Sequence, residues 1–475
     1  MADAGRRSGR GLDLGTMLEK QAGAFSGLPG VIMKRHSRML KAGLAVLLAA
    51  IALVGLKDTV AANEQSSASP GQVTFTRDVA PILQRSCQNC HHPGSIAPMS
   101  LMTYEDARPW ATSIKMRVSN REMPPWYIER NVGIQKFKDD PSLSDRDVAT
   151  IVKWVDEGSP RGNSADMPAA RVFDDTDRWH IGKPDLMVQL PKEQVIGPIE
   201  PDSWRDFTVD TGLKEDRYIQ AVETKPSAGA QRVVHHAASS MMFPGDGGDE
   251  RGGFLNEYAI GKNADIFPEE AGRLIKAGTK LRVNMHYHSI GEAVKDQTSI
   301  GFKFFPKGYS PRYTVVTQHV GDSFEEGIDI PAGADNVRND GYFVLPKPAI
   351  VQSFQPHMHN RGKRMCVEAI HVEGKIETLS CAKHNFAWML VYNYADDVAP
   401  VLPAGTIIHV IGWHDNTTAN RYNPDPRNWV GFGNRSIDDM SFAWMSFHYL
   451  TDQDYKDKLQ ERAKKVNTSN HNDQH

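Results

Sequence analysis

The 475-residue chain has little cysteine, little net charge and no long apolar run. Its 55 basic and 58 acidic residues leave a net charge of -3, which argues against nucleic-acid binding, because that function needs a basic face. Only four cysteines are present, two in one short motif and two farther along, and this division indicates two separate roles. Histidine, by contrast, is abundant, with 18 residues, several of them in pairs. This pattern is the first indication of bound metal.

The apolar run from Ala42 to Leu56 is too short to cross a bilayer, because it has 15 residues and a transmembrane helix needs about 20. A basic stretch precedes it, and the small residues Val60, Ala61 and Ala62 follow. Residues 1–62 therefore predict a secretory signal cleaved near Ala62. The predicted location is the periplasm or the extracellular space. An uncleaved anchor at 42–56, which would be the only membrane contact, is the alternative.

Residues 70–158 predict a haem domain. The motif Cys87-Gln88-Asn89-Cys90-His91 is the attachment pattern of c-type haem, in which two thiols bond the porphyrin and the histidine binds the iron. A redox dithiol or half of a zinc site are the alternatives, and no second cysteine pair lies nearby to support zinc. For the sixth ligand we predict Met123, which lies in a loop stiffened by two prolines. Its competitors are Met99, Met102 and Met116.

Two helices are expected in this domain. Phe75, Val79, Ile82 and Leu83 fall at helical spacing, just before the haem motif. A second helix should begin after Ser144 as N-cap, bury a stripe of apolar residues and end at Gly158; the stripe comprises Val148, Ile151, Val152 and Val155. The stretch resembles a small cytochrome c domain. Residues 159–185, rich in Pro, Gly, Ser and Asp, predict a linker.

From residue 186 to about 450 the pattern changes to short alternating segments with Pro/Gly turns, which predicts a mainly β fold of one or two sandwiches. In the segment 281–288, Leu281, Val283, Met285 and Tyr287 should face a core, so His286 and His288 share the opposite face. His235 and His236 are adjacent, and both can bind one metal only if their strand is bent or bulged. The polar tail 451–475 predicts one short helix.

His357 and His359 have the spacing that places two imidazoles on the same side of a strand, a few ångströms apart. A half-buried strand with two incidental histidines is the alternative. Met440, in Asp438-Asp439-Met440-Ser441, would by spacing alone be a core residue. His384, His409 and His414 are expected to be ordinary histidines of the β region.

Four motifs together resemble the copper type II, ascorbate-dependent monooxygenases. They are VVHHAASSMMF, VNMHYHS followed by DQTSIGFKF, HMHNRGK and DDMSFAWM, in the order of that family. The resemblance implies two jelly-roll β-sandwiches, at 186–310 and 311–450, that carry two copper ions. By the same resemblance, His235, His236 and His286 look like the ligands of an electron-transfer copper, and His288, on the same face as His286, could replace or join it. The ligands of the copper that binds O2 and substrate would be His357, His359 and Met440. A thioether favours Cu(I).

The implied activity is hydroxylation of a C–H bond in a small or peptide-like organic substrate, with O2 and two electrons. Ascorbate is the usual reductant of the family, and the fused haem domain or an electron-donor protein is the alternative source. The competing hypotheses are a non-catalytic exported haem–copper relay or copper carrier, and a β-sandwich binding module without metal. No motif in the sequence identifies the substrate.

Cys366 and Cys381 flank a hairpin pattern with Glu373-Gly374 as a two-residue turn. Centring the turn there pairs residue 371 with 376 and places the two cysteines directly opposite each other, close enough for a disulfide. Two free thiols are the alternative, and an exported protein would favour the bond.

Overall fold

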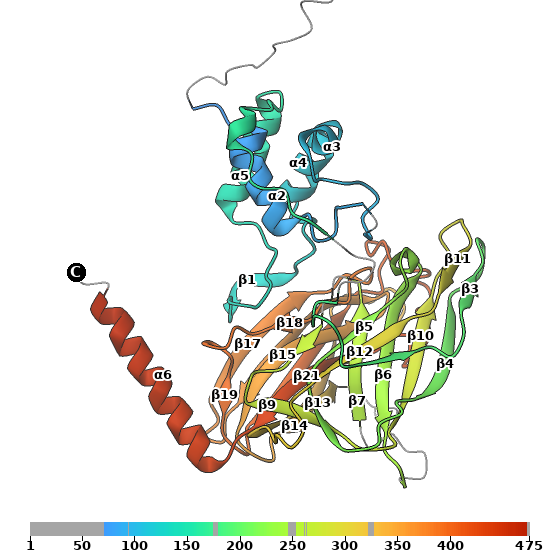
Figure 1. The fold of residues 1–475 in the computed structure, drawn as a ribbon, viewed down its shortest axis with the longest axis vertical. Coiled ribbons are helices and arrows are strands. Elements are labelled where there is room, and N and C mark those ends of the chain that lie inside the picture. The colour runs from blue at the N-terminus through green and yellow to red at the C-terminus, as the bar shows by residue number, and fades with distance from the viewer. Residues whose placement is uncertain are drawn as a thin grey trace, which may run out of the picture. The chain divides into compact units, whose positions relative to one another are not determined.

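The computed structural model describes residues 71–472 except 94, 174–178, 246–252, 261, 263 and 322–326, and it describes side chains as far as residue 465. The predicted signal segment lies outside the described residues. Within the described part of the chain, no helix is long and apolar enough to span a membrane. The chain is mainly β, as predicted, with several sheets and a few helices (Figure 1).

Residues 71–167 include a set of helices with a core of their own. They are η1 (Phe75–Val79), α2 (Ala80–Ser86), α3 (Tyr104–Ala107), η2 (Arg108–Trp110), α4 (Ala111–Ser119), α5 (Asp145–Asp156) and η3 (Ser164–Asp166). The predicted helix after Ser144 is confirmed: the Ser144 hydroxyl and the Asp147 carboxylate cap each other's backbone N–H groups. Ile151 and Trp154 are its fully buried residues, so the predicted apolar stripe was incomplete because it omitted Trp154.

The first sandwich contains a sheet in the order β4-β10-β6-β7. Its strands are β4 (Ser203–Asp210), β6 (Val234–Met242), β7 (Gly253–Ala259) and β10 (Lys280–Tyr287). Leu281, Val283, Met285 and Tyr287 are all buried in the core between the sheets, as the alternation predicted. The pair β3 (Gln194–Ile196) and β11 (Val294–Asp296) forms a separate ribbon.

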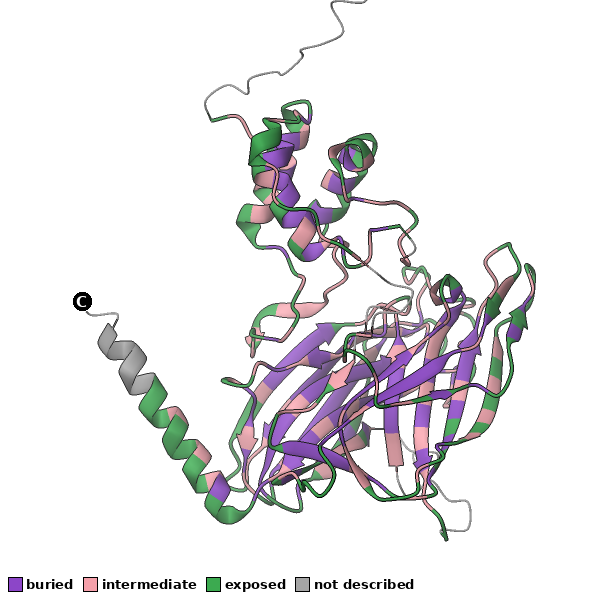
Figure 2. Cartoon of the chain, in the orientation of Figure 1, coloured by how far each residue is buried: buried purple, intermediate pink, exposed green. Residues whose placement is uncertain are grey.

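A second, ten-stranded sheet runs through both sandwiches. From the first half it takes β2 (Leu186–Gln189), β5 (Arg217–Lys225), β8 (Asp265–Ile266), β9 (Ala271–Ile275) and β12 (Ser299–Phe304). From the second half it takes β13 (Tyr313–Gly321), β15 (Ala349–Met358), β18 (Tyr392–Asn393), β19 (Val401–Leu402) and β21 (Ser441–Tyr449). The parallel pairing of β9 with β13 joins the halves. In Figure 2, most of the length of these strands is coloured as buried.

The remaining sheet completes the second sandwich in the order β1-β17-β16-β20-β14. Its strands are β1 (Ile128–Gly133), β14 (Val337–Val344), β16 (Gly362–Ile370), β17 (Ile376–Lys383) and β20 (Ile407–His414). Strand β1 belongs to the region predicted as the haem domain, yet it pairs with β17. Phe137, from the same region, is buried in the core of the second sandwich. The predicted haem domain and the second sandwich therefore share an interface.

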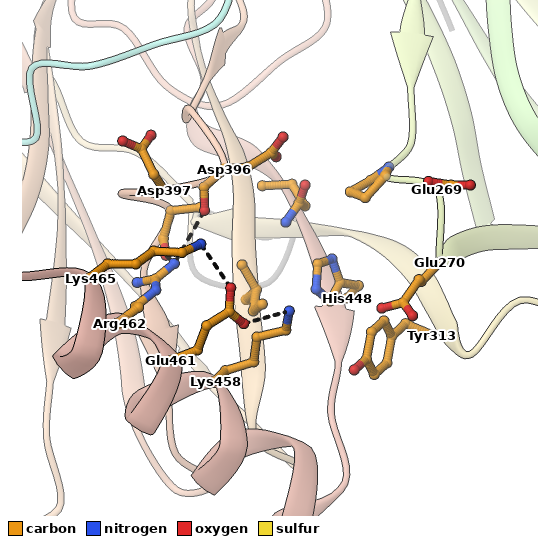
Figure 3. Close-up of a pocket in the computed structure, with 14 residues that line it drawn as sticks. Glu269, Glu270, Tyr313, Asp396, Asp397, His448, Lys458, Glu461, Arg462 and Lys465 are labelled. Carbon is orange, nitrogen blue, oxygen red and sulfur yellow. Dashed lines mark hydrogen bonds and ion pairs between the residues drawn. The ribbon is translucent and has the colours of Figure 1, made fainter. Parts of the chain in front are cut away.

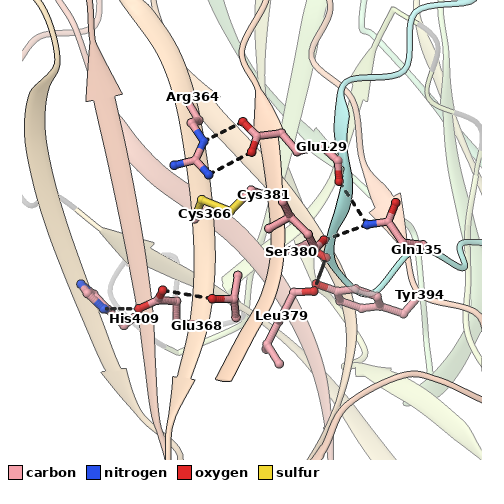
Figure 4. The surroundings of a disulfide bond; sticks show 12 residues. Glu129, Gln135, Arg364, Cys366, Glu368, Leu379, Ser380, Cys381, Tyr394 and His409 are labelled. Atoms are coloured by element: carbon pink, nitrogen blue, oxygen red, sulfur yellow. Dashed lines mark hydrogen bonds and ion pairs between the residues drawn. A yellow bond between two sulfur atoms is a disulfide. The ribbon is translucent and has the colours of Figure 1, made fainter. Parts of the chain in front are cut away.

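Cys366 and Cys381 are paired across β16 and β17 and form a disulfide with Cα atoms 4.0 Å apart (Figure 4). The predicted register near the turn is wrong by one residue, because Ile370 rather than His371 pairs with Ile376. A β-bulge that leaves Leu379 unpaired restores the register before the cysteines. The Leu379 carbonyl accepts a hydrogen bond from the Ile134 N–H instead (2.8 Å).

Two segments differ from their expected form. Residues 159–173, predicted as linker, pack on the helices: the Phe75 N–H donates to the Pro160 carbonyl (3.0 Å), and Phe173 stacks on His92 with ring centroids 4.1 Å apart. The tail forms α6 (Asp452–Asn472), which at 21 residues is not the short helix predicted. Its described side chains are mostly exposed (Figure 2).

Candidate metal centres

The first histidine group forms where β6 and β10 meet. His286 pairs with His236 but Tyr287 pairs with Val234, so His235 is the extra residue of a β-bulge in β6. A regular strand would turn adjacent side chains to opposite faces. The bulge turns both imidazoles to one side, and the sequence predicted that a shared metal would require this arrangement. Candidate ligand atoms of His235, His236 and His286 all lie within 4.8 Å of one another.

The environment of this group favours neutral imidazoles with available lone pairs. Burial lowers the pKa of His235 to about 3 and lowers the pKa of His236 and of His286 as well. His286 Nε2 contacts the Asp202 carboxylate (3.2 Å), while its buried Nδ1 has no hydrogen-bond partner. A histidine that donates one N–H to a carboxylate and keeps the other nitrogen free is a typical metal ligand. These side chains therefore fit a metal ion.

His288 lies at the edge of this group. It follows β10, its N–H donates to the Val233 carbonyl (2.9 Å), and its ring centroid is 6.2 Å from that of His235. The compact triad contains His286 and not His288. The geometry thus favours His286 as the third donor.

The second histidine group lies at the end of β15, with His357 in the strand and His359 directly after it. His357 and His359 are both buried, with ring centroids 5.4 Å apart. His359 Nδ1 contacts the Asp438 carbonyl (3.2 Å), which leaves Nε2 as the acceptor nitrogen. The buried His357 Nδ1 has no hydrogen-bond partner, and its ring stacks on Phe442 at 4.5 Å. Both rings therefore keep one nitrogen available to a metal.

Met440 directly precedes β21, the neighbour of β15, in which Ser441 pairs with Met358 and Phe442 with His357. The buried Asp439 carboxylate organises this corner. It accepts hydrogen bonds from the backbone N–H groups of His359 (2.8 Å), Arg361 (2.9 Å) and Met440 (2.9 Å). One acidic side chain thus ties the histidine strand to the methionine segment.

His414 and His384, expected to be ordinary histidines of the β region, both lie near the second group. His414 is completely buried, and its Nε2 lies 3.2 Å from the Met440 carbonyl and 3.4 Å from Asp439. Burial lowers the pKa of His414, but Asp439 outweighs this effect and the net pKa is raised. Burial lowers the pKa of His384 to about 4. Only the fold brings these side chains to the second group, so their spacing in the sequence gave no signal.

Phe386, in the loop between β17 and β18, contacts both histidine groups. Its ring centroid is 5.3 Å from that of His235 and 6.5 Å from that of His359. The two groups therefore share a neighbour, although 71 positions separate their nearest members, His286 and His357, in the sequence. Sequence reasoning missed Phe386 because no motif includes it.

In the predicted haem motif, Cys87 and Cys90 are free thiols, and burial raises the pKa of Cys87 to about 12. His91 Nδ1 contacts the Met99 carbonyl (3.1 Å), so Nε2 is the nitrogen left for iron. These three side chains fit a covalently attached haem. Met123 lies in the segment after α4, where its N–H donates to the Arg117 carbonyl (3.3 Å).

A cavity of about 240 Å³ lies elsewhere, beside α6 (Figure 3). Charged side chains line much of it, and several pair with one another: Glu461 bridges Lys458 and Lys465. None of the predicted histidine ligands lines it. Three of its other acidic side chains pair with basic residues outside the lining, Glu270 with Arg312, Asp396 with Lys138 and Asp397 with Lys136, so we assign the cavity no ligand.

No family model and no curated protein matches the chain. Among solved structures, N-glycanase F covers 56% of this chain and 95% of its own, with 10% identity and a TM-score of 0.25. A fucolectin from striped bass serum covers 55% of this chain and 86% of its own, with 6% identity and a TM-score of 0.15. Such weak similarities carry no argument about function.

Proposed function

We propose that this chain is an exported copper-dependent monooxygenase that hydroxylates a C–H bond of an organic substrate. The reaction consumes one O2, two electrons and two protons per C–H bond and yields the alcohol and water. The observation that carries the proposal is the pair of histidine groups, one half-buried and one buried, that lie on the two sandwiches and both contact Phe386. Their motifs resemble those of the copper monooxygenases, and their donor sets suit copper.

The two groups have different roles in this proposal. His235, His236 and His286 would hold a copper ion that passes electrons, and His357, His359 and Met440 would hold one that activates O2 beside the substrate. A site with a thioether favours Cu(I), the form that meets O2, whereas zinc rarely takes a methionine ligand. A c-type haem on Cys87, Cys90 and His91 would supply electrons, with ascorbate as the alternative reductant.

The chain's own residues prepare these sites. Asp202 orients His286, and the Asp438 carbonyl orients His359, so each ring is held with one nitrogen free. Low imidazole pKa values keep His235 and His357 unprotonated near pH 7. No proton therefore has to leave these rings before a metal binds.

The test compares Met440→Leu with Met242→Leu in copper-loaded protein, using O2 uptake and product analysis over a panel of candidate substrates. Met242 is a partly exposed methionine of β6 in the other sandwich and serves as control. We expect wild type and Met242→Leu to hydroxylate a substrate with matching O2 uptake and Met440→Leu to lose this activity. Full activity in Met440→Leu would contradict the proposed ligand set, and copper binding without any substrate oxidation would favour an electron relay.

A further inference from the structure

One short segment fastens the helices of residues 71–167 to the second sandwich. Strand β1 extends the sheet at the edge of β17, with Ile128 opposite Ala382 and Gly133 opposite Ser380. Beside the disulfide, Arg364 donates two hydrogen bonds to the Glu129 carboxylate, at 2.6 and 2.9 Å (Figure 4). A bidentate pair of this kind fixes orientation as well as position. The contact is thus a built interface.

Aromatic side chains on both sides of β1 strengthen the interface. Trp126 and Phe137 pack on Tyr392, with ring centroids 4.9 and 6.0 Å away. Edge-to-face aromatic pairs at such distances stabilise a contact beyond the effect of the area that they bury. The segment that follows Met123 is therefore held firmly on the second sandwich.

Tyr127 connects this segment to the loop after β17. Its carbonyl accepts a hydrogen bond from the Lys383 N–H (2.9 Å), and its hydroxyl accepts one from Asn385 Nδ2 (2.9 Å). On the other side, the Tyr422 hydroxyl donates to Asn385 Oδ1 (3.0 Å). Asn385 is therefore held from two directions, and the next residue is Phe386.

Phe386 is the side chain of this loop that reaches the candidate metal centres. Its ring lies against His235 and reaches His359 edge-on. A short sequence of contacts thus leads from Tyr127, four residues after Met123, through Asn385 and Phe386 to both groups. This loop is thus part of the interface and also lies beside both candidate metal centres.

We propose that Tyr127, Asn385 and Phe386 form the electron-entry link from the haem domain to the copper centres. This inference rests on the proposed function. In this step, a ferrous haem held by Cys87, Cys90 and His91 would lose one electron and become ferric, and a cupric ion held by one of the histidine groups would gain that electron and become cuprous. No bond forms or breaks and no proton moves. An external one-electron donor protein returns the haem to the ferrous state, and two transfers supply the electrons of one hydroxylation.

A second path competes with this link. Burial, Asp296 and Cys90 of the predicted haem motif, in that order, raise the pKa of the Tyr258 phenol. Tyr258 is on β7 and pairs with Ala237, next to His236. Electrons could cross there without using Phe386, so the experiment must separate the two paths.

The test measures haem reoxidation in haem- and copper-loaded protein, without O2 or substrate, after flash photoreduction of the haem. The decay of the ferrous haem absorbance reports intramolecular transfer and needs no turnover. We expect Phe386→Leu to slow the decay by about tenfold, equivalent to about 1.4 kcal/mol of activation free energy. Tyr127→Phe should slow it in the same direction.

Tyr422→Phe is the matched control, because it removes the other hydrogen bond to Asn385 and loosens the loop without cutting the link. Tyr258→Leu removes the competing path. Both should keep a rate close to wild type. Equal slowing in Tyr422→Phe and Tyr127→Phe would assign the effect to loop mobility, and slowing in Tyr258→Leu alone would assign the transfer to the other path. Either result overturns the inference.

A measurement on protein without haem or metal tests whether Tyr127 holds the loop in place. Hydrogen exchange of the backbone amides of 384–391 in metal-free protein should increase in Tyr127→Phe, because Asn385 loses one of its two anchors. Unchanged exchange there would contradict the role of Tyr127. If the chain binds no copper at all, the proposed function fails together with this inference. If the chain binds two coppers but both Tyr127→Phe and Phe386→Leu transfer electrons at the wild-type rate, only the inference is overturned.

Discussion

Replacing Asp439 by asparagine should damage both the fold and the second metal centre. The Asp439 carboxylate is completely buried and accepts three backbone N–H bonds, and its Oδ1 lies 3.4 Å from His414 Nε2. Asparagine has the same size but replaces one acceptor oxygen by an NH2 group. At least one buried N–H of His359, Arg361 or Met440 would then face another donor.

The cost follows from these contacts. An unsatisfied buried donor costs about 1–3 kcal/mol, and removing one partner of a buried ion pair costs about 3–5 kcal/mol. We expect Asp439→Asn to lower the free energy of unfolding of metal-free protein by about 3–5 kcal/mol. Because Asp439 also holds the backbone of His359 and Met440, copper affinity at the second centre should fall by about 10–100-fold.

The matched control is Asp438→Asn, one residue away. The Asp438 carboxylate pairs with the exposed Arg435, so its loss should cost less than about 1 kcal/mol. Its carbonyl, which contacts His359, is kept in the variant. Denaturant unfolding followed by circular dichroism gives the stability, and competition with a chelator gives the affinity. Equal stability and copper affinity in the two variants would refute the role of Asp439.

Two further predictions concern side chains at other positions. Burial raises the pKa of Glu257 to about 7 from its ordinary 4.5, so the folded state keeps a proton that the unfolded state loses. The stability that this group contributes is therefore present below pH 4.5 and is lost as pH rises to 7, by about 3 kcal/mol in total. The free energy of unfolding of Glu257→Gln, measured over this pH range, should lack this loss. A pH dependence of stability equal to that of wild type would contradict the reasoning. Asp202→Asn should lower copper affinity at the first centre by about tenfold, measured by chelator competition. The control Asp206→Asn, in the strand β4 that begins directly after Asp202, should leave this affinity unchanged. Similar copper affinities in the two variants would show that Asp202 does not support the site.

Regular patterns in the sequence predicted the elements that carry the histidines. The alternation in 281–288 gave the correct buried face, because each strand residue is turned by the same backbone geometry. The adjacent His235 and His236 could share a metal only with a bulge, and the structure has that bulge. The pairing of Cys366 with Cys381 was predicted correctly, although the turn was not, because one extra residue at Leu379 compensates for a longer loop.

Contacts between distant segments were beyond the reach of these patterns. His414 and Asp439 meet only after two strands pack, so neither has a signal in its neighbourhood. Phe386 lies in an irregular loop, where no periodicity indicates which way a side chain points. Residues 128–133 join a sheet of another predicted domain, because they pair with the edge strand β17. Whether a sheet has an unpaired edge cannot be predicted from amino-acid composition.

The most direct test of the account is the number of copper ions and haems bound per chain, in protein matured in an oxidising compartment with haem-attachment machinery. Metal analysis and the absorbance of covalent haem give both numbers. The account predicts two coppers and one covalent haem per chain, with one copper lost in His236→Ala and the other in His357→Ala. One haem with no copper, even after copper loading, would contradict the central claim and leave a haem domain fused to a β-sandwich binding module.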